Sequence, residues 1–93
     1  MNKKDLIDIV SEKTNNTKKN TTKIVDSFIE EISKSLANND KVLISNFGTF
    51  FVSETKPMNI FSPYDGKLIK DVIQTRVRFN SSQNLLDKIK KAK

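Results

Sequence analysis

The residues whose type and spacing most clearly suggest chemistry are Arg76 and Arg78, which alternate with Val77 and Phe79. Residues two apart on a β-strand point to the same face, so this pattern predicts a strand with one basic face and one apolar face. Arginines on such a face are suited to contacts with nucleic-acid phosphates. A solvated sheet face without a ligand would carry the same charges, so the pattern alone leaves that alternative open.

The net charge of the chain also indicates a polyanionic partner. The sequence has 17 Lys and Arg residues against 11 Asp and Glu residues, which gives a formal charge of +6. The excess lies at the C-terminal end, where residues 74–93 carry six basic groups and one acidic group. Nucleic acid is therefore the first partner class to consider.

Cysteine and histidine are both absent from the sequence. Their absence excludes disulfides, thiol nucleophiles, the usual zinc sites and catalysis by imidazole, so we expect no enzyme, no metal and no cofactor. The sequence has no apolar run long enough for a signal peptide or a membrane span, and we expect a soluble cytoplasmic protein. One core of 93 residues is only marginally stable unless a partner subunit adds buried surface.

Two helices are predicted before the strands. Asn2 caps the first helix, which ends by about Thr14. Its inward face is expected to carry three apolar residues, with Ile7 flanking them: Leu6, Ile9 and Val10. Thr17 caps the second helix, which ends at about Ala37. Its apolar stripe is expected to contain five residues: Val25, Phe28, Ile29, Ile32 and Leu36.

The remaining elements complete an α+β fold of order ααβββα. Residues 42–44 and 49–54 flank a tight connection and predict a hairpin in which Val42 and Ile44 share one face, as do Phe50 and Val52. Residues 73–79 predict a third antiparallel strand. Residues 80–82 cap a short last helix. We expect a single domain over residues 1–93, with a helical part at 1–40, a sheet at 41–80 and the C-terminal helix at 81–93.

A long connection at residues 55–72 has no core-facing pattern and contains its own turn signal, Ser62–Pro63–Tyr64–Asp65–Gly66. Such a connection inside a small domain is usually functional or disordered. We interpret it as a protruding β-arm.

Three stretches, MNKKDLI (1–7), VSEK (10–13) and NFGTF (46–50), together resemble the bacterial histone-like HU proteins and their relative, integration host factor. NFGTF is similar to the family's G-F-G-x-F signature, with Asn46 in place of the first glycine. Phe79 falls where the family places a third core aromatic, and the resemblance runs from end to end.

The resemblance implies an intertwined dimer with a helical base beneath a saddle of β-sheet, and two arms that enter the minor groove of DNA. It implies a non-enzymatic protein of the bacterial nucleoid. Such a protein would bind duplex DNA with little sequence specificity, bend it, compact it, and prefer bent, nicked or flexible DNA. A homodimer is expected and a heterodimer is possible.

The site residues predicted from the residue pattern and the resemblance together fall into two groups. The DNA-binding group contains nine residues: Lys3, Lys18, Lys56, Phe61, Pro63, Lys67, Lys70, Arg76 and Arg78. The dimer core contains six: Phe28, Ile29, Ile32, Phe47, Phe50 and Phe79. Pro63 matches the proline with which the family kinks the duplex, although a proline before Gly66 also suits an ordinary turn.

The arm departs from the family pattern of several arginines. Residues 53–73 carry three basic and three acidic groups, so the arm is electrically neutral. We therefore expect it to act through apolar contact, with Phe61 as a wedge beside Pro63. The alternative is an arm that packs against the body or a neighbouring subunit.

Other partner classes stay open from the sequence. Gln83 stands where many HU sequences have lysine, a choice shared with integration host factor. The chain could therefore be one subunit of a sequence-selective heterodimer. The basic charge permits binding to RNA or the ribosome, and the apolar arm permits docking on a protein partner.

Overall fold

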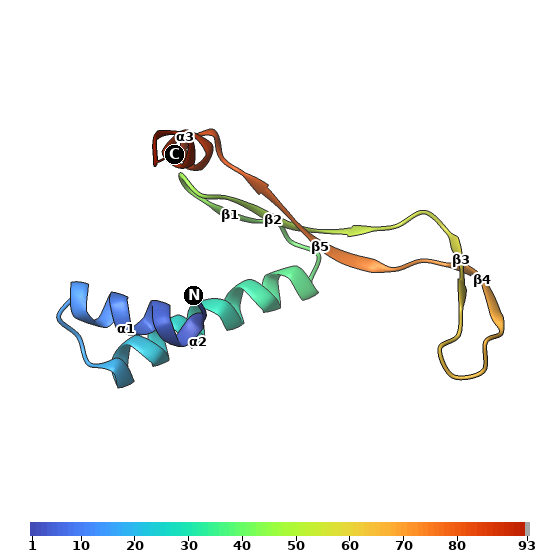
Figure 1. Cartoon of the computed structure of the whole chain (residues 1–93), viewed down its shortest axis with the longest axis horizontal. Helices are drawn as coiled ribbons and strands as arrows, with labels where there is room; N and C mark the ends of the chain where they lie inside the picture. The colour runs from blue at the N-terminus through green and yellow to red at the C-terminus, as the bar shows by residue number, and fades with distance from the viewer. Residues whose placement is uncertain (93) are drawn as a thin grey trace. The chain divides into compact units, whose positions relative to one another are not determined.

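The computed structural model describes residues 1–92; Lys93, which belongs to the predicted segment 81–93, lies outside them. The chain divides into two compact units, Met1–Lys34 and Ser35–Lys93. The elements occur in this order: α1 (Lys3–Lys13), α2 (Lys18–Ala37), β1 (Val42–Ile44), β2 (Gly48–Glu54), β3 (Met58–Phe61), β4 (Leu68–Val72), β5 (Thr75–Ser81) and α3 (Gln83–Ala92) (Figure 1). No helix among these is long and apolar enough to cross a membrane.

The predicted α+β class is confirmed. β1, β2 and β5 form the expected three-stranded antiparallel sheet in the order β1-β2-β5. β3 and β4 form a separate two-stranded sheet, which is the arm expected at residues 55–72. Figure 1 shows this ribbon continuing from the ends of β2 and β5.

Side-chain caps set the start of each helix. The Asn2 side chain accepts a hydrogen bond from the Asp5 backbone N–H at 2.9 Å, and the Asp5 carboxylate accepts one from the Asn2 N–H at 3.1 Å. Thr17 Oγ1 accepts from the Asn20 N–H, and Ser82 Oγ from the Leu85 N–H, both at 3.1 Å. These bonds satisfy N–H groups that the first helical turn leaves unpaired, so the helix starts follow from local sequence.

The buried side of α1 differs from the prediction. Ile7, expected to flank the apolar face, is the one hydrophobic side chain that is buried within residues 1–92, whereas Leu6, Ile9 and Val10 are exposed. Ser11 and Thr21 are buried in the same unit. The Ser11 hydroxyl donates to the Asp8 carbonyl and the Thr21 hydroxyl donates to the carbonyl of the cap residue Thr17, so neither hydroxyl needs water.

The connection between β1 and β2 explains why asparagine can replace a glycine there. Asn46 has a φ of 64°, a left-handed conformation that asparagine tolerates better than most residues. Its side-chain oxygen accepts a hydrogen bond from the Asn84 amide. Gly48 is needed for space, because a Cβ there would lie 2.5 Å from the carbonyl oxygen of Asn80.

β5 begins two residues later than predicted, at Thr75. Gln74 is held outside the strand by two hydrogen bonds with Thr55: its carbonyl accepts from the Thr55 N–H, and its own N–H donates to Thr55 Oγ1, both at 3.0 Å. The junction between sheet and arm therefore has its own bonding pattern. Ile73, predicted to continue the apolar alternation, lies in this junction and is exposed.

Candidate nucleic-acid interface

The β2–β5 register places Arg76 and Arg78 on one face of the three-stranded sheet. Arg78 lies opposite Phe51, and Arg76 lies opposite Ser53. Arg78 Nε donates a hydrogen bond to Ser53 Oγ at 3.3 Å, which holds the guanidinium over the sheet. We call this the basic face, and strand alternation assigns seven residues to it: Leu43, Thr49, Phe51, Ser53, Arg76, Arg78 and Asn80.

The basic face has no compensating negative charge. Glu54, the nearest strand carboxylate in sequence, pairs with Thr75 and belongs to the opposite face. Among the strand residues described for this sheet, the basic face therefore has two guanidinium groups and no Asp or Glu. Such a surface attracts a polyanion to the β5 side of the sheet, where both arginines lie.

The opposite face, which we call the apolar face, carries an aromatic cluster. The Phe79 ring lies 4.8 Å from that of Phe50 and 5.3 Å from that of Phe47, and both pairs are tilted. Val52 and Val77 pair on the same face. Although these residues pack together, Val77 remains 60 % exposed, so the cluster is open on one side.

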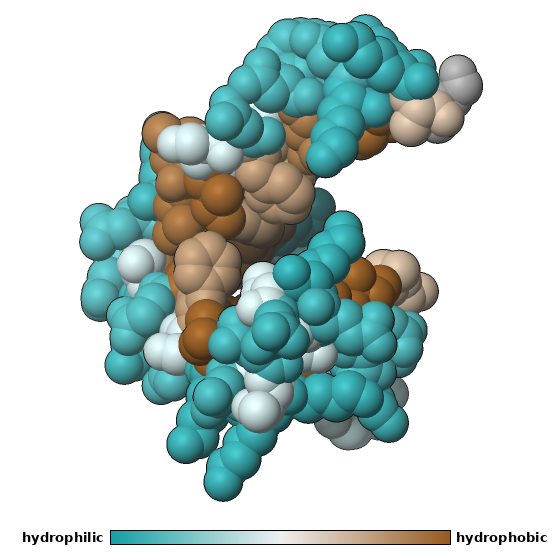
Figure 2. Space-filling view, turned by 90° about the vertical axis from the view of Figure 1, so that its left-hand side faces the viewer, coloured by the Kyte–Doolittle hydropathy of each residue, from teal (hydrophilic) through white to brown (hydrophobic). Residues whose placement is uncertain are grey.

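The residues expected in the dimer core are largely uncovered in the single chain. Phe28, Ile29, Phe47 and Phe79 are exposed. Ile32 and Phe50 are half-buried. Figure 2 shows apolar patches open at the surface.

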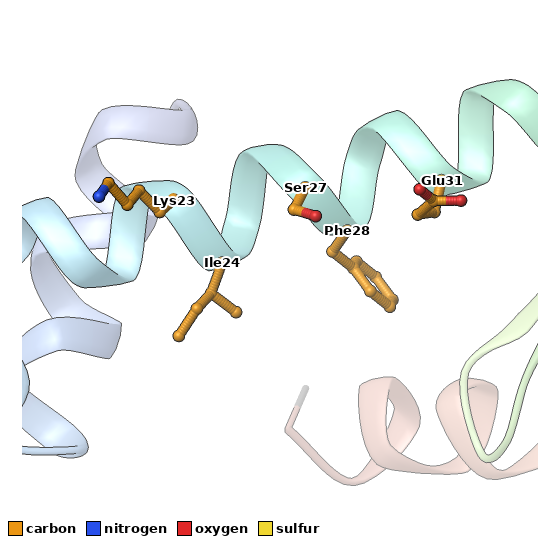
Figure 3. Close-up of a pocket in the computed structure, with 5 residues that line it drawn as sticks. All are labelled: Lys23, Ile24, Ser27, Phe28 and Glu31. Atoms are coloured by element: carbon orange, nitrogen blue, oxygen red, sulfur yellow. The ribbon is translucent and has the colours of Figure 1, made fainter.

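A depression on α2 is lined by Lys23, Ile24, Ser27, Phe28 and Glu31. Figure 3 shows Ile24 and Phe28 projecting from the same side of the helix. Ile24 is exposed and was not included in the predicted apolar stripe. The depression thus has an apolar centre, with a cation towards one end and an anion towards the other.

Two of the predicted DNA-binding lysines already have partners. Lys3 Nζ lies 2.7 Å from Asp26 Oδ1, and Lys18 Nζ lies 3.4 Å from Asp8 Oδ1. Both pairs join α1 to α2, and their side chains are more than one-third exposed, so the attraction within each pair is weak. A phosphate can compete for either lysine, but it must first displace a carboxylate.

The arm carries apolar residues on both of its faces. Phe61 pairs with Leu68 on one face and Ile60 pairs with Ile69 on the other. The register then shifts at a bulge between Met58 and Ile60, beyond which Met58 pairs with Val72. Asp71, next to Val72, has a φ of 58°. Lys56, Lys67 and Lys70 lie on the arm, but Asp65 and Asp71 offset most of their charge.

The tip, residues 62–67, places Pro63 in a turn closed by hydrogen bonds. The Ser62 N–H donates to the Lys67 carbonyl at 2.8 Å, and the Gly66 N–H donates to the Ser62 carbonyl at 3.0 Å. Gly66 has a φ of 71°, a conformation that favours glycine. Phe61, directly before the tip, is 71 % exposed.

The predicted DNA-binding residues fall into groups within the two units. Arg76 and Arg78 share the basic face, Phe61 and Pro63 adjoin at the tip, and Lys3 and Lys18 lie on the helices. Sequence reasoning missed Phe51, which lies opposite Arg78. Alternation along residues 49–54 places Phe51 away from Phe50, but only the strand register brings it to the arginine.

Comparison with known proteins agrees with this geometry. The family model described as bacterial DNA-binding protein matches residues 1–90. The DNA-binding protein HU of Staphylococcus aureus (strain COL) is 38% identical over 91 residues, which cover 97% of this chain and 100% of the relative. Integration host factor subunit alpha of Bordetella avium is 34% identical over 85 residues, covering 91% of this chain and 73% of the relative.

Among solved structures, the chain is similar to HU in the Anabaena HU–DNA cocrystal structure. The TM-score is 0.84 at 27% sequence identity, and the match covers 96% of this chain and 97% of the other.

Proposed function

Because the chain belongs to the HU and integration host factor family of bacterial DNA-binding proteins, we propose that it binds duplex DNA with little sequence preference and acts on DNA architecture. It bends DNA, compacts the nucleoid of a bacterial cell and catalyses no reaction. The observation that carries the proposal is the basic face, which presents two arginines and no carboxylate beside a long β-arm.

Binding in this proposal begins with phosphate contacts. Arg76 and Arg78 neutralise backbone phosphates and release counterions, so affinity falls steeply as salt rises. Lys3 and Lys18 bind flanking phosphates after exchanging their carboxylate partners. Lys56, Lys67 and Lys70 contribute less, because the neighbouring arm carboxylates weaken their field.

Bending comes from the arm. Pro63 and Phe61 enter the minor groove and separate a base step, and the bend brings more of the duplex against the basic face. A step that is already nicked, gapped or flexible is easier to deform, which accounts for the proposed preference for such DNA. The neutral arm acts through apolar contact and shape rather than through charge.

We further propose that two copies form the functional unit. The uncovered apolar face is one surface for the second subunit to cover, and the α2 residues Phe28, Ile29 and Ile32 are another. Within this dimer, residues 1–93 act as one domain. Burial of these surfaces supplies the core that the single chain lacks, since residues 1–92 bury only Ile7 among their hydrophobic side chains.

The charges on α2 favour a homodimer. Lys23 and Glu31 lie four residues to either side of Ser27, at opposite ends of the depression. A two-fold axis near Ser27 places Lys23 of each subunit beside Glu31 of its partner, and the contact occurs twice. Lys23→Glu should therefore weaken the dimer in sedimentation experiments, and the double exchange Lys23→Glu/Glu31→Lys should restore it. A double variant as weak as the single one would contradict this pairing.

A second candidate is a sequence-selective subunit of the integration-host-factor type. The 34% identity to integration host factor subunit alpha favours it, as does Gln83 at the start of α3. In the structure Gln83 Nε2 donates to Asp87 Oδ1 at 2.9 Å, within its own helix. Selection of a consensus site from a pool of random duplexes would support this candidate, whereas recovery of unrelated sequences supports the low-specificity function.

The main test compares binding to an intact duplex, a gapped duplex of equal length and an RNA duplex across a salt series. Arg76→Ala/Arg78→Ala is compared with Lys90→Ala/Lys91→Ala, which removes the same charge from the last turn of α3. We expect tight binding to DNA, a preference for the gapped duplex and a larger loss in the arginine variant. Equal losses in both variants, or tighter binding to RNA, would overturn the proposal.

A further inference from the structure

Tyr64 occupies an unusual position at the tip of the arm. Its side chain is 97 % exposed, the highest value among the exposed large hydrophobic side chains of residues 1–92. Neither aromatic pair found within these residues involves Tyr64. A large ring with both faces open to water gains nothing for the fold of this chain, but both faces are available to a ligand.

The backbone that carries Tyr64 is held in place by the tip. The Tyr64 N–H donates to Ser62 Oγ at 3.3 Å, and the Lys67 N–H donates to Asp65 Oδ1 at 3.0 Å. These bonds add to the two backbone bonds that close the turn between Ser62 and Lys67. Pro63 restricts the backbone directly before the tyrosine. The ring is thus presented from an ordered turn, which lowers the entropic cost of binding.

The chemistry of the tip favours a nucleobase over a phosphate as its target. Asp65 and Lys67, the two charged residues of the tip, have opposite charges, so the tip has no net attraction for an anion. An aromatic ring stacks on any nucleobase without needing charge. In an intact duplex each base is stacked on both faces, whereas a base opposite a gap can turn out of the helix and offer a free face.

We propose that Tyr64 stacks on an unpaired base, so that the arm tip distinguishes gapped DNA from intact duplex. This inference rests on the proposed DNA-binding function and adds a contact separate from the wedge of Phe61 and Pro63. The wedge deforms a base step, while Tyr64 binds a base that has already lost its partner. Tyr64 would then contribute directly to the preference for gapped DNA, in addition to the greater flexibility of the gapped duplex.

The composition of the chain provides a direct readout. Tyr64 is the single tyrosine and the sequence has no tryptophan, so the tyrosine emission of the protein reports Tyr64 alone. The experiment titrates the protein with a duplex that has a two-nucleotide gap and, in parallel, with an intact duplex of equal length. Anisotropy of a dye on the DNA measures binding independently. We expect strong quenching of Tyr64 by the gapped DNA and little by the intact duplex, at equal occupancy.

Two variants separate stacking from general apolar contact. Tyr64→Phe keeps the ring, and Tyr64→Leu keeps apolar surface without it. We expect Tyr64→Leu to lose about tenfold in affinity for gapped DNA, and Tyr64→Phe to stay within about twofold of the wild type. Neither variant should change affinity for intact duplex by more than about twofold, because the tip finds no free base there.

The outcomes also distinguish this inference from the proposed function. Unchanged tyrosine emission on gapped DNA that anisotropy shows to be bound, or a Tyr64→Leu variant that keeps wild-type affinity, would overturn stacking and leave DNA binding intact. Failure of the wild-type protein to bind either DNA would instead overturn the function on which the inference rests.

Discussion

The basic face and the arm are two surfaces proposed to contact the same ligand, yet their chemistry is opposite. The basic face carries Arg76 and Arg78 without a carboxylate, over a strand pair that is apolar on its other side. The arm has nearly balanced charges and exposes Phe61, Tyr64, Leu68 and Ile69. In the proposed function this difference separates two tasks: we expect the sheet to supply affinity that depends on salt, and the arm to supply shape and apolar contact that depend little on salt.

The largest expected effect is on the stability of the fold, because the aromatic residues on the apolar face of the three-stranded sheet pack against one another. Phe79→Ala removes the ring that contacts both Phe47 and Phe50, and should lower the free energy of unfolding by about 3 kcal/mol or more. Phe61→Ala in the arm should change it by less than about 0.5 kcal/mol. Urea denaturation at one fixed protein concentration measures both. Similar losses would show that the arm aromatic is also structural and would break the distinction.

The next effect concerns charge on the basic face. Arg76→Ala/Arg78→Ala should weaken binding to duplex DNA roughly a hundredfold at low salt, because two charged hydrogen-bond donors to phosphate are lost from each subunit. The slope of log affinity against log salt should become shallower by about 2 or more, according to how many phosphates the arginines neutralise in the wild-type complex. Binding isotherms at several salt concentrations provide the measurement. An unchanged slope would place the phosphate-binding residues elsewhere.

A smaller effect is expected from the arm. Phe61→Ala should reduce the DNA bend angle and weaken binding about tenfold, because an apolar wedge is lost, while the salt slope stays the same. Energy transfer between dyes at the two ends of a short duplex measures the bend. The matched control is Ile69→Ala, which removes an exposed apolar side chain from the opposite face of the arm, where Ile69 pairs with Ile60. Unchanged bending in Phe61→Ala would exclude the wedge.

The smallest effect tests the lysines on the helices. Asp26→Asn frees Lys3 from its carboxylate partner and should raise DNA affinity about twofold to fivefold at low salt, with no gain at high salt. Asp40→Asn removes the same charge from a residue that pairs with no lysine among residues 1–92, and corrects for the change in net charge. Equal gains in the two variants would mean that Lys3 makes no separate contribution.

Features that depend on neighbours in the sequence were predictable. The helix starts follow from Asn2, Thr17 and Ser82, which bond to N–H groups three residues on. The alternation of Arg76 and Arg78 with apolar residues likewise indicated a two-faced strand. The arm was recognisable because residues 55–72 lack a core-facing pattern while carrying a turn signal.

Features that depend on distant residues were not predictable in the same way. The inward residue of α1 was assigned to the wrong side, because apolar spacing does not reveal that the buried side of the helix carries Ile7 and the polar residue Ser11. The carboxylate partners of Lys3 and Lys18 each lie on the other helix. Residues 1–41 contain seven acidic residues, and no local sequence rule identifies Asp26 among them as the partner of Lys3. The bulge in the arm likewise depends on pairing across the arm.

The sequence by itself determined the helix caps, the strand polarity, the charge of each segment and the family, because these depend on residue type and local spacing. The tertiary structure alone decided that Arg78 lies opposite Phe51, that Lys3 pairs with Asp26, and that the ring of Tyr64 extends into solvent from an ordered tip. Register, long-range ion pairs and exposure are set by which backbone segments meet. That choice rests on the free energy of packing the whole chain rather than on any one stretch of it.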